Sequence, residues 1–328
     1  MRELLLLLCR YPFEEKNKEL LLKLISGVKD WHKLVELINA HGIIALATYN
    51  IKEAGLVKEI PKDAMTILEN GYFQNILRNA WLTERWKEVN TILYNADIKH
   101  ILLKGMALEH TIYGSRGLRQ MNDNDILIKY EESVKAWELL QQIGFTQKPI
   151  KSPLFKKIMF DIGQHLPTLY KNGYAIEIHN NLFDQRMTGT ESSFDYFEDA
   201  VEIKISGVNA LILSKEVQVM YLINHFERHA LEGECQLRLF NDIMLLDKNS
   251  TIEFPDCFIS DPIQSSKPEF RKAVFRTNIN LLPGKKRLLY IIGDIFPSQK
   301  WMKERYKCNG VKTFLYYPLR MGKLMWLI

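Results

Sequence analysis

The sequence predicts an α/β protein of the mixed α+β class, in which a small mixed sheet lies between two helical regions. Three observations predict this class. Apolar side chains recur at helical spacing through residues 1–96, the run Ile101-Leu102-Leu103 has the character of a buried strand, and Asn172-Gly173 separates two alternating segments. Residues 214–328 return to helical patterns broken by prolines. We therefore expect a helical N-terminal region at 1–96, a core at 97–213 and a helical C-terminal region at 214–328.

The composition excludes several classes of protein. The chain has 328 residues, of which 47% are hydrophobic and 25% charged, as in a soluble globular protein. The net charge of +5 is too small to indicate nucleic acid by itself. No run approaches the ~20 apolar residues that span a bilayer, so we expect a cytoplasmic protein. The scattered cysteines fit a reducing cytosol and argue against structural zinc and a disulfide framework: Cys9, Cys235, Cys257 and Cys308.

The N-terminal region is predicted to be helical throughout. Asp30 is a plausible N-cap for the helix that starts at Trp31, and Pro61 opens a long helix. Aromatic residues in the long helix recur at helical spacing, which favours packing over ligand contacts. The expected helices before it are Arg2–Arg10, Lys18–Ile25, Trp31–Ala40 and Ile43–Ala54.

A strand at Lys99–Leu103 is predicted to stop at Lys104-Gly105 and to be followed by a helix at Met106–Tyr113. A strand, a glycine and a helix in this order offer backbone N–H groups to a phosphate, and glycine permits close approach. We expect Lys104 either to reach the phosphates or to cap the end of the strand.

Two arginines in the following loop are candidate phosphate ligands. Arg119 carries a planar, permanently charged fork that suits a phosphate, and Arg116 is a weaker candidate. The alternative role for Arg119 is a salt bridge to Glu109 or Asp123.

The next predicted strand, Asp123–Ile128, carries two carboxylates on one face. Side chains alternate along a strand, so Asp123 and Asp125 are neighbours about 6.5–7 Å apart. Carboxylates this close repel each other unless a cation or proton intervenes. Mg²⁺ prefers carboxylate oxygens and keeps water and phosphates as its other ligands. The pair therefore predicts a site for Mg²⁺, or Mn²⁺, and a nucleotide.

Asn172-Gly173 predicts a two-residue hairpin between Gln164–Tyr170 and Tyr174–Asn180. On the second arm Glu177 and His179 share a polar face opposite an apolar one, as on the strand with Asp125. Glu177 is therefore our candidate for the third metal ligand or the general base. His179 would orient that carboxylate or contact the acceptor.

The arrangement resembles the nucleotidyltransferases of the DNA polymerase β superfamily. Their core is a strand with a small glycine turn, a helix and a strand with D-x-D or D-x-E, matched here by Leu103-Lys104-Gly105-Met106 and by Asp123 and Asp125. Arg119 before the acidic pair is similar to the bacterial "NTP transferase 5" branch. The resemblance extends over most of the chain, through Glu177-Ile178-His179, the helix around His225 to His229 and Ile295-Phe296-Pro297.

This resemblance implies a polymerase β-like core and metal-dependent transfer of a nucleoside monophosphate from an NTP to an acceptor. It also implies a histidine near the hairpin base, where His165 stands, which we expect to be structural or near the acceptor. Met106 departs from the family pattern, which has a small hydroxyl residue there. Met106 therefore leaves open an alternative: an inactive module that binds a nucleotide or a protein.

The C-terminal region contributes further candidates. Ser214 is a plausible N-cap for a helix through His229, and a second helix is expected at Leu237–Leu246. His225 and His229 share a face, but H-x-E-x-H is not the zinc-protease spacing. A helix-surface or acceptor-pocket role for His229 is therefore favoured over a metal-dependent hydrolase. Arg238 and Asp242 are further candidates for a second site.

The acceptor is open between a small molecule, a sugar, a protein side chain and RNA. The basic last stretch is either solvated or contacts an anionic partner.

Overall fold

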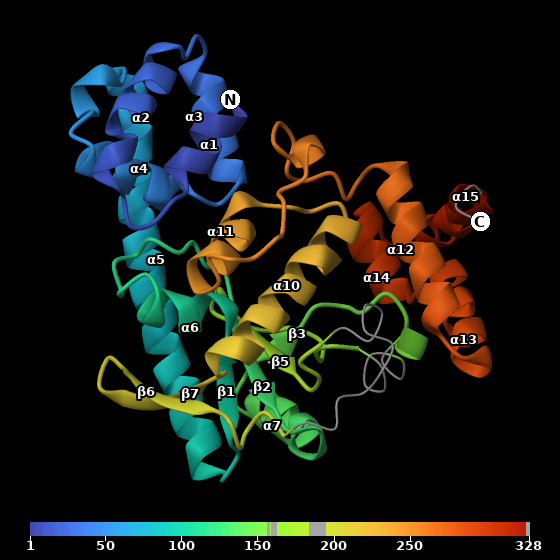
Figure 1. Cartoon of the computed structure of the whole chain (residues 1–328). Coiled ribbons are helices and arrows are strands. Elements are labelled where there is room, and N and C mark those ends of the chain that lie inside the picture. Colours follow the sequence, from blue (N-terminus) through green and yellow to red (C-terminus); the bar gives the residue numbers. More distant parts are fainter. Residues whose placement is uncertain (156–157, 159–162, 184–194, 326–328) are drawn as a thin grey trace.

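A seven-stranded mixed sheet forms the centre of the protein (Figure 1). The computed structural model describes residues 1–155, 158, 163–183 and 195–325. The strand order is β3-β4-β5-β2-β1-β7-β6, with β1–β7 and β2–β5 parallel and the other neighbours antiparallel. This confirms the predicted mixed class. The strands are β1 His100–Leu103, β2 Asn124–Ile128, β3 Thr146–Gln147, β4 Leu169–Lys171, β5 Tyr174–His179, β6 Val201–Ile205 and β7 Val208–Ile212.

Short helices at the N-terminus pack around their own apolar core. Leu5, Leu34 and Leu46 are fully buried there. The Asp30 carboxylate accepts a hydrogen bond from the backbone N–H of Lys33 at 2.9 Å, which confirms the predicted N-cap. The helices are α1 Arg2–Leu8, α2 Lys18–Ser26, α3 Trp31–Ala40 and α4 Ile44–Glu53, with 3₁₀ turns η1 Glu15–Asn17 and η2 Val57–Glu59.

The long helix α5, Lys62–Asn95, joins these helices to the sheet. Its first turns bury Met65 and Leu68 in the N-terminal core, whereas Trp86 and Leu93 belong to the core beneath the sheet. One continuous helix of 34 residues therefore links both parts. The boundary at residue 96 stays a prediction.

The two faces of the sheet have different partners. Leu102 and Ile126 pack with the second half of α5 and with α7, Tyr130–Gln142. On the opposite face Leu103 and Leu127 pack with Tyr221 of α10, Lys215–Leu231. Asp125 is two residues from Leu127 and so belongs to the face that α10 covers.

The predicted hairpin turn is confirmed. Asn172 and Gly173 have φ of +50° and +81°, the left-handed pair of a type I′ turn. The first arm is shorter than predicted, because only Leu169–Lys171 is a strand, but His165 still forms an isolated bridge with His179. The turn thereby fixes which side chains of β5 reach the α10 face.

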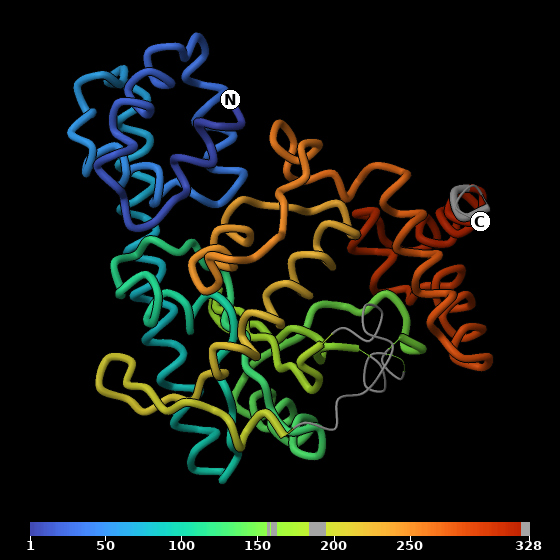
Figure 2. Tube along the Cα trace, in the orientation of Figure 1, coloured from blue at the N-terminus to red at the C-terminus, as the bar shows by residue number. Residues whose placement is uncertain are grey.

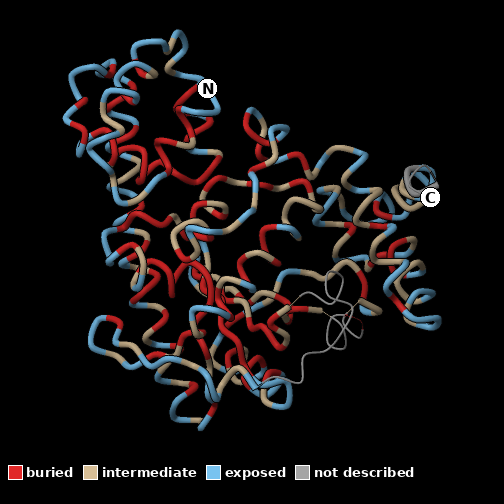
Figure 3. Tube along the Cα trace, viewed as in Figure 1, coloured by how far each residue is buried: buried red, intermediate tan, exposed pale blue. Residues whose placement is uncertain are grey.

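The C-terminal helices lie on the opposite side of the molecule from α1–α4, so the N-terminus and the C-terminus lie on different sides (Figure 2). Figure 3 shows that buried residues are concentrated in the sheet and the N-terminal helices, while α12–α15 are largely exposed. Within the described residues, no helix combines the length and the apolar character needed to cross a membrane. The elements after α10 are α11 Leu237–Leu246, η3 Asp256–Phe258, α12 Pro268–Leu281, α13 Gly284–Ile295, α14 Gln299–Tyr306 and α15 Lys312–Met325. The helix between β1 and β2 is α6, Lys104–Thr111.

Candidate active site

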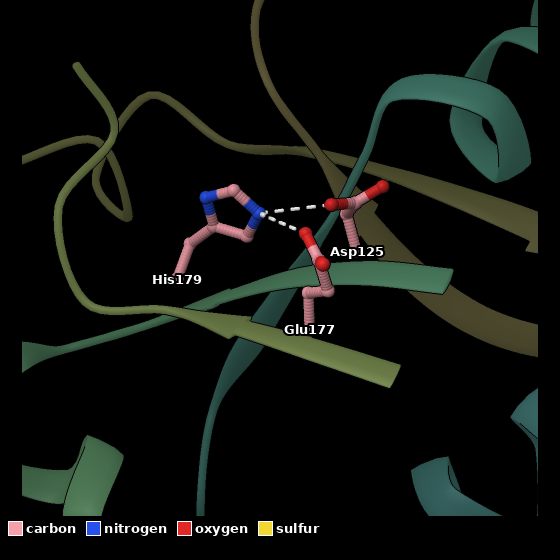
Figure 4. Close-up of side chains that lie close together, drawn as sticks. All are labelled: Asp125, Glu177 and His179. Atoms are coloured by element: carbon pink, nitrogen blue, oxygen red, sulfur yellow. Dashed lines mark hydrogen bonds and ion pairs between the residues drawn. The ribbon is translucent and has the colours of Figure 1, made fainter. Parts of the chain in front are cut away.

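Two carboxylates and an imidazole converge on neighbouring strands. In the parallel pair β2–β5, Asp125 lies directly beside Glu177, and His179 follows on the same face. One ligand atom of each residue lies within 4.8 Å of the others (Figure 4). Asp125 and His179 are buried and Glu177 is partly exposed. The register thus places two acids and a histidine as potential ligands of one metal ion.

Asp125 is held by two donors. The Lys104 Nζ lies 2.6 Å from Asp125 Oδ1, and His179 Nε2 lies 2.9 Å from the same oxygen. Burial works to raise the pKa of Asp125, but the Lys104 charge and the His179 hydrogen bond outweigh it and hold that pKa well below its usual range. Asp125 is therefore ionised at any physiological pH.

Lys104 occupies an unusual backbone conformation. The helix α6 begins at Lys104 rather than at Met106, and Lys104 has φ of +48°. A non-glycine residue in this region costs of order 1–3 kcal/mol and is common at functional sites. The side chain pairs with Asp125, a partner that the sequence did not indicate for it. Its role toward phosphate stays a prediction.

Asp123 precedes β2 and lies outside the group of three ligand atoms. Its surroundings still couple it to that group: burial first, then the charges of Asp125 and Glu177, raise the pKa of Asp123 to about 7. By distance, the group of potential ligands consists of Asp125, Glu177 and His179, with Asp123 as an adjacent acid. The ligand set of Asp123, Asp125 and Glu177 stays a prediction.

Glu177 is the least restrained acid of the cluster. Thr168 donates a hydrogen bond to its Oε1 at 2.9 Å, and its side chain keeps 20% of its exposure. The Nε2 atoms of His165 and His179 lie 4.0 and 3.9 Å from its Oε2. Burial, followed by the Lys104 charge, lowers the pKa of His179 to about 4, so this ring is neutral at pH 7. His165 is therefore a neighbour of the site, as its place at the hairpin predicted.

Packing also bears on the glycine of the turn. A Cβ on Gly105 would lie 2.8 Å from the Met121 Cγ, so a larger residue here would force the Met121 side chain to move. The role of Gly105 toward phosphate stays a prediction. Met106 is buried in the core, with its sulfur 3.7 Å from the Thr83 hydroxyl. Its side chain therefore supplies no polar group to a phosphate. The first turn of α6 carries no side-chain cap.

The two predicted phosphate arginines lie elsewhere. Arg119 is buried and forms a salt bridge with Asp242 of α11 at 2.7 Å, and its Nε lies 2.8 Å from the same carboxylate. The expected partners Glu109 and Asp123 were wrong for the side chain, although Glu109 does accept the backbone N–H of Arg119. Arg116 contacts the Tyr49 hydroxyl at 3.5 Å, beside the N-terminal helices. The structure does not bring either guanidinium to Asp125.

The histidine pair of α10 binds an arginine. Arg228 Nη2 lies 3.3 Å from both His225 Nδ1 and His229 Nε2, so both rings face a cation. Burial, then Arg228, lowers the pKa of His229 to about 3. This arrangement disfavours a metal between the two histidines. Glu227, between the two histidines in sequence, is exposed.

Two residues of α10 next to the site, Tyr221 and Arg228, were not predicted from the sequence. Tyr221 packs edge-on to His179 at 6.4 Å and stacks on His225 at 6.1 Å. Tyr221, His225 and Arg228 recur at i, i+4 and i+7, which puts them on one face of α10. This spacing, which can be read from the sequence, predicts that the three side chains lie together.

Comparison with known families agrees with this geometry. The model of an uncharacterised nucleotidyltransferase family matches residues 28–261. The chain belongs to this nucleotidyltransferase family. The match includes the strands of the acidic cluster and both helices α10 and α11, whereas α12–α15 follow it. Membership of a nucleotidyltransferase family indicates a transferase. Searches of curated proteins and of solved structures found no match.

Proposed function

We propose that the protein transfers a nucleoside monophosphate from an NTP to an acceptor, and that Asp125, Glu177 and His179 hold a divalent ion for this reaction. The observation that carries the proposal is the convergence of their ligand atoms within 4.8 Å in a chain of the nucleotidyltransferase family. Asp123 would serve as an additional carboxylate next to that ion.

The donor set fits a divalent cation. Carboxylate oxygens suit Mg²⁺ and Mn²⁺, and the imidazole nitrogen of His179 is better matched to Mn²⁺ than to Mg²⁺. The raised pKa of Asp123 reflects its burial next to Asp125 and Glu177, which an added cation would offset. When bound, the ion would neutralise charge on the phosphoryl oxygens and polarise them.

The protein side chains have separate tasks. Without an ion, the neutral His179 ring donates from Nε2 to Asp125 and orients that carboxylate. To hold the ion through Nε2, the ring would carry its proton on Nδ1, which has no partner among the described residues. Lys104 holds the same oxygen and is the nearest cation to a phosphate docked at the start of α6. Glu177 is partly exposed and takes the proton of an acceptor hydroxyl as general base.

One observation favours a second candidate, a nucleotide-binding module without transfer activity. Met106 packs into the core and offers no hydroxyl to a phosphate. Such a module would bind an NTP without releasing pyrophosphate. The acceptor is a small molecule, a protein side chain or RNA.

Pyrophosphate release tests the proposal. Purified protein is incubated with each NTP, Mg²⁺ or Mn²⁺ and a cell extract as the source of acceptors. Glu177→Gln is expected to lower release by about 10²–10⁴-fold, because a base contributes that much. Glu131→Gln, at an exposed position on α7, is the matched control and is expected to retain full activity. Equal release by wild type and Glu177→Gln would refute the base. Nucleotide binding without release in any extract favours the module.

A further inference from the structure

The walls around Asp125 carry opposite charges. The sheet contributes Asp123, Asp125 and Glu177, while α10 and α11 contribute Arg228 and Arg238, and Lys104 lies between them. Arg119 adds no net charge because Asp242 neutralises it. The acidic wall suits a cation, and the basic wall therefore suits an anion.

Buried donors without partners are concentrated at this basic wall. Twelve buried side-chain atoms among the described residues have no hydrogen-bond partner. Five of them are N–H or O–H donors, and two of these belong to Arg85 and Trp86 of α5. The other three are one hydroxyl and two Nε–H groups, and they belong to Tyr221, Arg228 and Arg238. An unmet buried donor costs about 1–3 kcal/mol, and native proteins keep few of them. Three donors on two adjacent helices point to a ligand rich in acceptors.

The two arginines are positioned by their neighbours. His225 and His229 both accept from Nη2 of Arg228, and Glu232 lies 3.6 Å from its Nη1. These contacts fix the guanidinium plane and leave Nε without a partner. Arg238 donates from Nη1 to the Gln120 carbonyl at 3.1 Å. A Cβ at Gly42 would lie 2.6 Å from Cδ of Arg238, so the stem of this arginine is packed against the N-terminal helices. Both guanidinium groups are therefore preorganised before a ligand arrives.

Electrostatics agrees with an anion at this position. Burial and the nearby Arg119 lower the pKa of Arg238 to about 10, which an anion would reverse. The charges of Arg228, Lys104 and Arg238 all lower the pKa of His229, so the three cations lie around one region.

We infer that Tyr221, Arg228 and Arg238 form a binding site for the polyphosphate of the donor nucleotide, opposite the carboxylates. This inference rests on the proposed function for its ligand. Each guanidinium would donate to two phosphate oxygens, and the Tyr221 hydroxyl would donate to a third. The arginines that bind phosphate would then come from α10 and α11, in place of Arg116 and Arg119.

Calorimetric titration with inorganic tripolyphosphate in EDTA tests the site without requiring transfer. Arg228→Gln and Arg238→Gln are each expected to raise the dissociation constant at least tenfold. Arg276→Gln, at an exposed position on α12, is the control and should match wild type. Arg228→Lys keeps the charge but loses the planar guanidinium, so its dissociation constant should lie between those of wild type and Arg228→Gln.

Tyr221→Phe covers the case in which an arginine variant fails to fold, because the lost hydroxyl donates to no group in the described structure and interacts only with the Lys104 ammonium. It is expected to weaken tripolyphosphate binding several-fold with an unchanged unfolding temperature. Wild-type affinity in Arg228→Gln, Arg238→Gln and Tyr221→Phe would overturn the inference. Tripolyphosphate binding that depends on these residues, in a protein that releases no pyrophosphate, would support the anion site. It would contradict the proposed transferase activity. An effect on the KM of a phosphorylated acceptor alone, with NTP and tripolyphosphate binding unchanged, would also overturn it.

Discussion

Two buried ion pairs, Lys104–Asp125 and Arg119–Asp242, differ in what surrounds them. Lys104–Asp125 and Arg119–Asp242 have similar lengths, 2.6 and 2.7 Å, and similarly low exposure. Asp242 also accepts from the Tyr113 hydroxyl at 2.8 Å. The Arg119–Asp242 pair is therefore closed, since its charges balance and its carboxylate is saturated with donors.

The Lys104–Asp125 pair is open. Asp123 and Glu177 add two acids beside one ammonium, and burial, followed by the charges of Asp125 and Glu177, raises the pKa of Asp123. Lys104 also has a left-handed backbone. Burial of an ion pair therefore does not by itself indicate a functional site. Uncompensated charge next to the pair, as at Lys104–Asp125, does indicate one. The following variants test this comparison.

The largest effect is expected for Arg119→Met. Loss of Arg119 leaves Asp242 buried and unpaired, which should lower the free energy of unfolding by about 3–5 kcal/mol. Denaturant unfolding measures it. Lys129→Met removes an exposed pair with Asp195 and should leave the free energy of unfolding nearly unchanged, because solvent screens this pair. The double variant Arg119→Met/Asp242→Leu should regain most of the loss, and equal costs for Arg119→Met and Lys129→Met would contradict the closed-pair interpretation.

Lys104→Met should behave differently once a metal is added. In metal-free buffer the unpaired Asp125 should cost about 3 kcal/mol. A cation can replace the ammonium, and at a Mn²⁺ concentration 100 times the dissociation constant linkage gives about 2.7 kcal/mol. Thermal unfolding with and without Mn²⁺ should thus show a larger gain for Lys104→Met than for wild type or Arg119→Met. The same gain in all three would mean that the metal does not compete with Lys104.

Local sequence patterns predicted the sheet face but not its ion pairs. Alternation on two strands and the Asn172-Gly173 turn were enough to bring Asp125 and Glu177 together, because a period of two and a fixed turn determine the face. The Arg119–Asp242 pair joins residues 123 positions apart, which no local pattern encodes. The Lys104–Asp125 pair depends on a left-handed residue, and lysine gives no signal for that conformation.

The pH dependence of the free energy of unfolding provides a further test of the charges around the Lys104–Asp125 pair. The pKa of Asp123 is ordinarily near 3.8 and is raised to about 7 in the fold by burial, then by Asp125 and Glu177. The folded state therefore holds this proton more tightly, so the cost of ionised Asp123 is complete above pH 7 and is relieved as pH falls toward about 4.

Asp123→Asn should remove that dependence. In EDTA it should be more stable than wild type above pH 7, with a difference that shrinks on acidification at no more than about 1.4 kcal/mol per pH unit. Denaturant unfolding from pH 5 to 8 measures the difference. Parallel curves for the two proteins would show that the acids around Asp123 do not act on it.

The smallest effect concerns the backbone of Lys104. Lys104→Gly and Lys104→Ala both lose the ammonium, but only glycine adopts φ of +48° without steric cost. Glycine should therefore be the more stable by about 0.5–1 kcal/mol, after its greater unfolded-state entropy is counted. At Lys135, in the interior of α7, the order should reverse, because alanine is favoured in a helix by about 1 kcal/mol. If alanine is also better at residue 104, the left-handed backbone depends on the ion pair, and Asp125 rather than the fold holds Lys104 in place.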